Sequence, residues 1–335
     1  MRNLLTDVPG IRVGHAGDMR LGSGVTAIVF DEPAIAAADI RGGGPGTRET
    51  DLLDPSMTVE RIDAIALSGG SAFGLDAGGG VQARLREQGR GYAVGEARVP
   101  IVPGAILFDL LSGGDKNWRH YPPYRELGHA AAVGASTYFA LGSVGAGLGA
   151  TTFNLKGGIG SASATTRDGV IVSALAAVNA AGSVTLGDTP CFWAAPFERD
   201  GEFGALGFPA PIPPEAISLR TKGSAGQSTV LAVVATDAAL NKGQAKRLAM
   251  MAQTGLARAI YPVHTPIDGD IVFAVAMGSR AISDPVGGLL EIGATAANVL
   301  ARAIARGVYE ATALPFPHAM PSWRDKFTRQ VAERT

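Results

Sequence analysis

Short runs of apolar residues recur along the chain, and glycine-rich or polar segments separate them. Five of these runs are short enough for strands and have no helical spacing, and they cover residues 24–30, 62–67, 171–178, 230–235 and 271–276. Two of them, 230–235 and 271–276, are apolar throughout, and each of the other three contains a single polar residue, so none alternates regularly. Because a strand covered on both faces has such a pattern, we expect them to lie inside the protein.

Three longer segments have the apolar spacing of amphipathic helices, and they cover residues 74–88, 242–259 and 294–311. Thr236 and Asp237 are predicted to cap the second helix. Residues 92–109 are expected to be extended and 115–125 to form a loop, while the chain beyond residue 315 reads as irregular. Residues 221–227 are polar and glycine-containing, which predicts an exposed linker. Strands alternating with helices indicate a layered α/β fold.

Composition and charge narrow the class of protein. The chain has 335 residues, of which 46% are hydrophobic and 18% charged, and its net charge is −1. These values predict a cored globular protein and argue against nucleic acid or an anionic membrane as partner. The N-terminal sequence has no apolar signal segment, and a cytoplasmic location is expected. The single cysteine, Cys191, cannot form an internal disulfide, and a small buried side chain is its favoured role.

Thr229 stands where the polar linker meets the apolar run 230–235. A hydroxyl is a poor nucleophile unless a base takes its proton. A threonine that becomes a chain N-terminus carries its own base, because a free α-amine ordinarily has a pKa of about 7.7–8.0. Hydroxyl side chains at strand starts are common, so this position alone is a weak indication.

Asp268 and Asp270 flank a glycine just before the run 271–276. Two carboxylates this close raise each other's pKa and can share protons with an amine and a hydroxyl. A solvated Asp-Gly turn is the competing interpretation.

Seven ordered blocks resemble the self-processing N-terminal-nucleophile peptidases, a family that includes L-aminopeptidase/D-amidases, β-peptidyl aminopeptidases and nylon-oligomer endo-hydrolases. The blocks are GGGPGTRETDLL (42–53), LSGGSAFGLDAGGGV (67–81), IVPGAILFDL (101–110), KGGIGSAS (156–163), VNAAG (178–182), TVLAVVATDA (229–238) and HTPIDGD (264–270). They span nearly the whole chain, and the Asp-x-Asp pair is most similar to the nylon-oligomer branch.

The resemblance implies a site made of Thr229 as nucleophile, Asp268 and Asp270 as the acidic pair, Lys156 as the active-site lysine and Asn179 as oxyanion donor. It also implies self-cleavage between Ser228 and Thr229. The family's active-site tyrosine corresponds to Phe108, which lines the expected substrate pocket but cannot donate a hydrogen bond.

The implied fold is a layered αββα sandwich of the self-processing aminopeptidase and ornithine-acetyltransferase type, formed by one domain over residues 1–335. Cleavage would give fragments 1–228 and 229–335. The expected activity is hydrolysis of short peptides or small amides without a cofactor or metal, by a homo-oligomer, with a tetramer favoured.

Other functions remain open at this stage. Ser71 stands in a turn like a hydrolase nucleophile elbow, but Phe73 occupies the place of the motif's second glycine. The glycines of residues 145–149 resemble a nucleotide-binding loop, but their spacing is GxGxG and not the GxGxxG of that motif. Two alternatives remain. The protein could be a family member that no longer cleaves itself and acts as a binding protein, or it could be a related acyltransferase.

Overall fold

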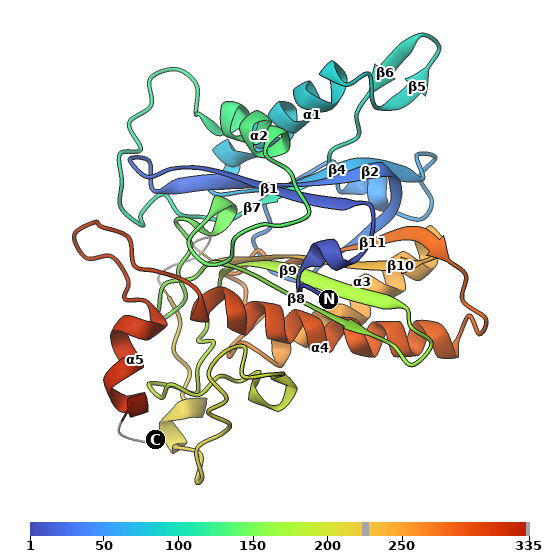
Figure 1. The fold of residues 1–335 in the computed structure, drawn as a ribbon. Helices are drawn as coiled ribbons and strands as arrows, with labels where there is room; N and C mark the ends of the chain where they lie inside the picture. The colour runs from blue at the N-terminus through green and yellow to red at the C-terminus, as the bar shows by residue number, and fades with distance from the viewer. Residues whose placement is uncertain (223–227, 333–335) are drawn as a thin grey trace.

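The computed structural model describes residues 1–222 and 228–332. It consists of four layers, in which two helices cover one sheet layer and two further helices cover the other (Figure 1). The strands are β1 (Ile11–Asp18), β2 (Ser23–Ile40), β3 (Thr47–Arg48), β4 (Arg61–Ser68), β5 (Tyr92–Val94), β6 (Ala97–Val99), β7 (Gly104–Ile106), β8 (Ile159–Thr165), β9 (Ile171–Asn179), β10 (Thr229–Ala238) and β11 (Ile271–Arg280). The α-helices are α1 (Ala77–Glu87), α2 (Tyr124–Val133), α3 (Lys242–Ala257), α4 (Gly287–Tyr309) and α5 (Trp323–Ala332). The predicted αββα sandwich is confirmed.

The long strand β2 joins the two sheet layers. The strand order is β3-β7-β4-β2-β11-β10-β9-β8, and β1 also pairs with β2. The first part of β2 pairs with β1 and β4, and after a register shift between Val29 and Ala34 its last part pairs with β11. A single strand can therefore belong to both layers, because the irregularity lets it bend from one to the other.

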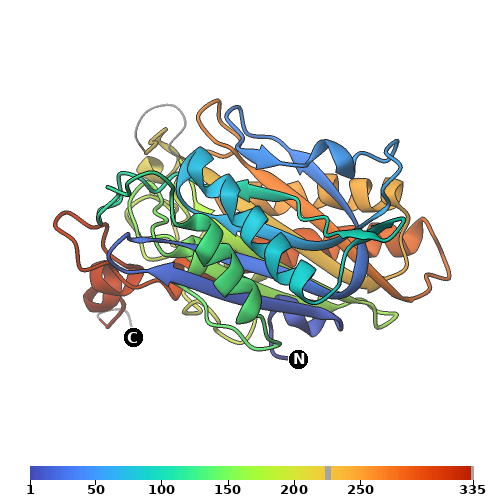
Figure 2. The ribbon, with the colours of Figure 1, turned by 90° about the horizontal axis from the view of Figure 1, so that it is seen from above.

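The helices cover the two outer faces. Viewed from above, α1 and α2 lie next to each other over the upper sheet layer (Figure 2). On the opposite side, α4 packs under β8 and β9, and α3 packs against β11 and β2. By length and composition α4 could cross a membrane, but most of its apolar residues belong to the core cluster beneath the sheet.

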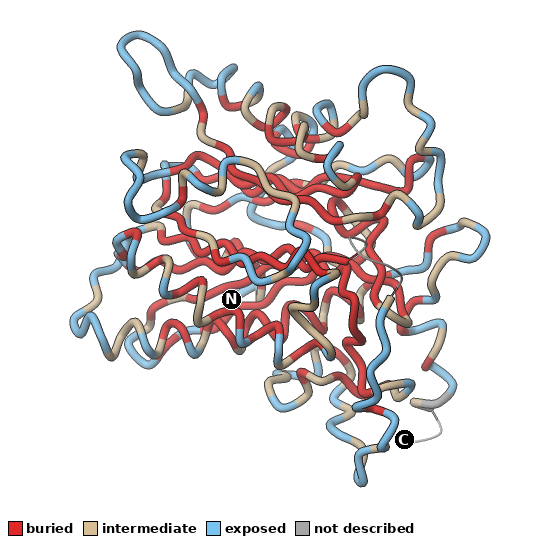
Figure 3. The backbone as a smooth tube through the Cα atoms, turned by 180° about the vertical axis from the view of Figure 1, so that it is seen from behind, coloured by how far each residue is buried: buried red, intermediate tan, exposed pale blue. Residues whose placement is uncertain are grey.

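Strand β10 is central in the lower layer and all ten of its residues are buried (Figure 3). It runs antiparallel to β9 and parallel to β11. Val230, Ala232 and Val234 face the helices, whereas the alternate side chains face the space between the two sheet layers. The strand buries both faces, which explains the uninterrupted apolar run in its sequence.

The five predicted strands and three predicted helices are all present, but two local expectations were wrong. Thr236 and Asp237 lie inside β10, and α3 is capped by Asn241, whose side chain accepts a hydrogen bond from the Gln244 amide. The C-terminal region also contains the helix α5. Of the predicted linker 221–227, residues 223–227 lie outside the described residues, Thr221 is exposed and Lys222 is half-buried.

A buried ion-pair network ties the N-terminal segment to α4. Arg302 donates to both carboxylate oxygens of Glu202, at 2.5 and 3.0 Å, and also to Asn3 Oδ1 and to the carbonyl of Ser163. The side chains of Arg302 and Glu202 are 4% and 7% exposed. Residues on both sides of the predicted cleavage point thus share one network.

We expect Glu202→Ala to lower the free energy of unfolding by roughly 3–5 kcal/mol, because it leaves the Arg302 charge buried without a partner. Urea denaturation measures the change. Glu310→Ala, which breaks the solvent-exposed pair with Arg324, is the control and should cost at most about 1 kcal/mol. Equal effects of the two substitutions would contradict a stabilising role for the buried network.

Candidate active site

Thr229 is the first residue of β10, and the carbonyl of Ser228 before it accepts two hydrogen bonds. The Thr229 hydroxyl donates to this carbonyl at 2.5 Å, and the main-chain N–H of Gly269 donates to it at 2.9 Å. Thr229 is only 4% exposed and Ser228 1%. The hydroxyl therefore lies against the peptide bond that precedes it, in a place largely closed to water.

Gly269 has no room for a side chain. A Cβ atom there would lie 2.6 Å from Thr229 Oγ1 and 2.8 Å from the carbonyl oxygen of Gly44. Both distances are shorter than real Cβ contacts. Glycine is required because the amide of residue 269 must approach the Ser228 carbonyl while the Thr229 hydroxyl occupies the adjacent space.

The two predicted carboxylates flank Gly269 and hold the backbone around the hydroxyl. Asp270 accepts a hydrogen bond from the amide of Val230 at 2.8 Å, and its second oxygen accepts from the amide of His264 at 3.1 Å and from its ring Nδ1 at 2.9 Å. Asp268 accepts from the amide of Ala181 at 3.2 Å. The acidic pair thus connects β10, the end of β9 and the loop before β11.

The electrostatics of this pair raise the pKa of one carboxyl group, that of Asp268. Burial raises the pKa of Asp268, and the nearby Asp270 charge raises it further, while hydrogen bonds from Thr265 act in the opposite direction. A carboxyl group with a raised pKa can take up and return a proton at neutral pH more readily than a solvated one.

The glycine-rich loop before β3 forms the outer support of the acidic loop. The amides of Arg41 and Gly42 donate to the carbonyl of Asp270, and the amide of Gly44 donates to that of Asp268 at 2.7 Å. A Cβ at Gly42 would lie 2.3 Å from the Asp270 nitrogen, so this close backbone contact needs glycine. The GGGPG block therefore positions the Asp-Gly-Asp turn.

Asn179 lies directly opposite Thr229 in the register of β9 and β10. Its Oδ1 accepts hydrogen bonds from the amide of Thr151 at 3.0 Å and from Lys222 Nζ at 2.8 Å. Its Nδ2 donates to the carbonyl of Phe108 at 3.1 Å. The structure thus brings the predicted oxyanion donor beside the predicted nucleophile.

Lys222 is the functional candidate that the sequence did not predict. Its amine donates to the carbonyl and hydroxyl of Thr151, at 2.9 and 3.0 Å, as well as to Asn179. Burial lowers its pKa to about 7, although the charges of Asp268 and Asp109 act to raise it. Lys222 lies in the polar segment 221–227, whose composition predicts an exposed linker and not a buried amine.

Lys156, the lysine implied by the resemblance, is fully buried in a different environment. Its amine donates to the carbonyls of Gly147, Ala150 and Gly157 at 2.7–2.9 Å. Burial lowers its pKa to about 7, and Asp109 and Lys222 are the charges that act on it. These bonds fix the glycine-rich turn next to β8, and the role of Lys156 in chemistry stays a prediction.

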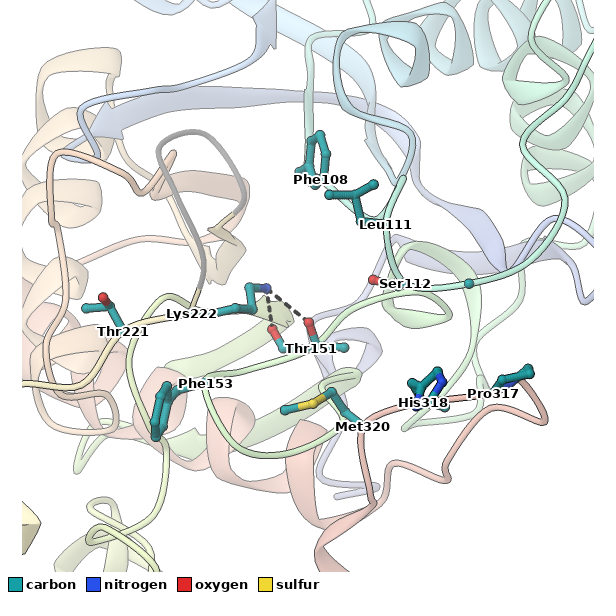
Figure 4. A pocket seen from close by; sticks show the side chains of 12 residues that line it. Phe108, Leu111, Ser112, Thr151, Phe153, Thr221, Lys222, Pro317, His318 and Met320 are labelled. Atoms are coloured by element: carbon teal, nitrogen blue, oxygen red, sulfur yellow. Dashed lines mark hydrogen bonds between the residues drawn. The ribbon is translucent and has the colours of Figure 1, made fainter.

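Phe108 lines a cleft of about 590 Å³ beside Asn179. Lys222 and Thr151 form part of its wall, and the hydrogen bonds between them are drawn in Figure 4. Cavities of this size accept small organic ligands. The cleft is the candidate substrate pocket.

The rival sites have structural roles. Cys191 is fully buried beside Leu186 and Ala216, as expected for a small core side chain. In the glycine-rich segment 145–149, a Cβ at Gly147 would lie 2.4 Å from the amide nitrogen of Ile159, so this glycine permits close packing inside the protein. Ser71 has a φ of 52° at the turn into α1, where its amide donates to the carbonyl of Leu107.

Comparisons with known proteins identify the family of this chain. Residues 3–320 match the peptidase family S58. An uncharacterized aminopeptidase of Mycobacterium tuberculosis (strain ATCC 25618 / H37Rv) is 43% identical over 97% of this chain and 98% of its own length. A 6-aminohexanoate-oligomer endohydrolase of Kocuria sp. (strain KY2) is 28% identical over 88% of this chain and 81% of its own length.

Solved structures show the same fold at low sequence identity. The L-aminopeptidase D-Ala-esterase/amidase of Ochrobactrum anthropi, described as a variant of the Ntn hydrolase fold, gives a TM-score of 0.73 at 19% identity, covering 99% of this chain and 94% of that one. A β-aminopeptidase of Burkholderia sp. gives a TM-score of 0.71 at 22% identity, covering 99% and 93%.

Fold and relatives together define a hydrolase of peptide or amide bonds with an Ntn-type architecture. The chain belongs to peptidase family S58.

The buried Lys156 gives a testable pH dependence of stability. In the unfolded chain its pKa returns to the ordinary value of 10.5, whereas burial holds it at about 7 in the folded protein. Between these values the unfolded chain binds the extra proton. The free energy of unfolding should therefore rise with pH above 7, by up to about 1.4 kcal/mol per pH unit from this group.

Denaturation of the wild type and of Lys156→Met between pH 7 and 9 isolates this contribution. The difference in unfolding free energy, wild type minus variant, should increase with pH. A constant difference would mean that the folded protein keeps Lys156 protonated, with its charge stabilised by the three carbonyls.

Proposed function

We propose that this protein is a self-processing N-terminal-threonine hydrolase that cuts its own chain between Ser228 and Thr229. The products would be fragments 1–228 and 229–335, and the mature enzyme would hydrolyse short peptides or small amides. The observation that carries the proposal is the double hydrogen bond to the Ser228 carbonyl, from the Thr229 hydroxyl and from the Gly269 amide.

In the self-cleavage step, Thr229 Oγ attacks the carbonyl carbon of Ser228. The C–N bond to Thr229 breaks, the hydroxyl proton ends on the Thr229 nitrogen, and an ester replaces the amide. The Gly269 amide is placed to donate to the oxyanion while it exists, since it already donates to the same oxygen. Water then hydrolyses the ester and leaves a carboxylate on Ser228 and a free amine on Thr229.

In the mature enzyme the same hydroxyl would attack the substrate amide. The Thr229 amine would accept its proton and return it to the leaving amine. The amide group of Asn179, opposite Thr229, would stabilise the oxyanion. Asp268 and Asp270 would hold the amine and the backbone of β10, as Asp270 already does through Val230.

The two fragments should stay together after cleavage. Strand β10 would belong to the second fragment but pairs over eight residues with β9 of the first. Strand β11 of the second fragment likewise pairs with β2 of the first. The homo-oligomer, with a tetramer favoured, and the cytoplasmic location are part of this proposal, and light scattering after gel filtration tests the assembly.

Intact mass under denaturing conditions tests self-cleavage directly. We expect the wild type to give two chains that break between Ser228 and Thr229, and Thr229→Ala to remain whole because it lacks the attacking oxygen. Thr229→Ser keeps a hydroxyl and should still cleave, which makes it the matched control.

A wild-type chain that stays uncut over days would disprove self-processing. Cleavage could occur while the mature protein transfers the acyl group of an amide substrate only to an added amine and never to water. That result would establish the acyltransferase alternative.

Gly269→Ala should slow self-cleavage by at least about tenfold, because the added Cβ collides with Thr229 Oγ1 and displaces the amide from the Ser228 carbonyl. The cleavage rate is measured by mass spectrometry on freshly synthesised chain.

Gly44→Ala is the control from the facing loop. Its Cβ would have the Asp268 carbonyl oxygen at 3.6 Å as its nearest contact, so cleavage should proceed at nearly the wild-type rate. Wild-type cleavage by a folded Gly269→Ala protein would rule out the proposed role of this amide.

A further inference from the structure

The cleft beside Asn179 is lined by apolar and polar side chains, and the Lys222 amine is among them. Phe108, Leu111, Phe153 and Met320 supply apolar surface (Figure 4). The titratable side chains among its described lining residues are Lys222 and His318, and no carboxylate lines it in this described part. A free ammonium group in the cleft would therefore meet the Lys222 amine and find no acidic partner there.

The two carboxylates whose charges act on Lys222 are already engaged in hydrogen bonds. Asp268 is only 2% exposed, and its two carboxylate oxygens accept hydrogen bonds from Ala181 and from Thr265. Asp109 is fully buried and accepts from Ser23 and from the amide of Gly70. Neither carboxylate is arranged to bind an ammonium group in the cleft.

Lys222 and Thr151 form an arrangement suited to an anion. The Lys222 amine donates to Thr151 Oγ1 at 3.0 Å, so this hydroxyl accepts there and can donate its own hydrogen toward the cleft. Thr151 also lines the cleft. A carboxylate beside this pair would gain a hydrogen bond from the hydroxyl and the attraction of the lysine charge.

The place of Lys222 in the sequence relates the cleft to the acyl side of the proposed reaction. In self-cleavage the acyl side of the broken amide is the segment that ends at Ser228. Lys222, six residues earlier on that acyl side, lines the cleft. Its main-chain amide also donates to the carbonyl of Ala181, and its amine to Thr151 and Asn179, so it is held in place independently of the bond that is cut.

We propose that this cleft binds the acyl part of the substrate and selects acyl groups with an apolar stem and a terminal carboxylate over those with a terminal ammonium. The inference rests on the proposed function, because it assigns the acyl side of the reaction of Thr229. Substrates of this class are amides of dicarboxylic acids and peptides with a blocked N-terminus and an acidic side chain.

Binding to the uncut Thr229→Ala protein tests the cleft without requiring catalysis. Three ligands with six-carbon acyl groups are compared by calorimetry at pH 6, below the pKa of the Lys222 amine: adipic acid monoanilide, hexananilide and 6-aminohexananilide. We expect the monoanilide to bind at least tenfold more tightly than 6-aminohexananilide, with hexananilide between them. Tightest binding of 6-aminohexananilide, or no binding of any ligand, would overturn the proposal.

Two substitutions on the same background identify the source of the selectivity. Lys222→Gln should reduce the ratio of affinities to less than about threefold, and a folded Lys222→Gln protein with the full ratio would contradict the proposal. Should this variant fail to fold, Thr151→Val removes the donating hydroxyl and should likewise reduce the ratio. Arg98→Gln removes one positive charge from the exposed strand β6 and should leave the ratio unchanged.

The outcomes separate this inference from the proposed function. An uncut wild-type chain together with tight monoanilide binding would refute self-processing and support the cleft assignment as an anion site. A cleaved, active wild type that hydrolyses 6-aminohexanoyl p-nitroanilide faster than the adipoyl compound would refute the selectivity and leave self-processing intact.

Discussion

The hydrogen bond from the Gly269 amide to the Ser228 carbonyl is the contact on which the site depends. It exists because β10 and β11 are neighbouring parallel strands, so the residues just before each strand meet at one edge of the sheet. Thr229 begins one strand and the Asp-Gly-Asp turn precedes the other. The loop of residues 42–44 then fixes the turn from outside by bonding to its carbonyls. Each partner contributes mainly backbone, which explains why glycine is so frequent around the site.

Burial shifts the charged groups around this contact toward neutrality. The pKa values of Asp109 and Asp268 are raised, and those of Lys156 and Lys222 are lowered to about 7, with burial as the largest cause in all four. The side chains nevertheless remain hydrogen-bonded, and each of the two lysine amines donates to three oxygen atoms. Such poised groups are common where proton transfer is needed, and less so in purely structural cores.

The sequence predicted those features that depend on neighbouring residues in the chain and not on contacts between distant segments. The apolar run of β10 could be recognised because burial on both faces leaves a direct signal. The spacing of Asp268 and Asp270 was also compatible with a solvated turn, and the resemblance to the family assigned them to the site. Strand β8 was missed because its small residues, selected by close packing against α4, resemble a loop. Lys222 was missed and Lys156 was placed in the site by resemblance alone, since which acceptors an amine reaches is decided by contacts between distant segments.

The position of β10 in the middle of the sheet has a consequence for the life of the molecule. If the bond before Thr229 is cut, the central strand and its neighbour β9 belong to different polypeptides. Folding of the intact precursor is an intramolecular event, whereas refolding of the cut protein requires two chains to meet. Stability of the mature form would then depend on protein concentration. A cut protein would regain its structure only by association of its two chains, so its refolding would become slower as the solution is diluted.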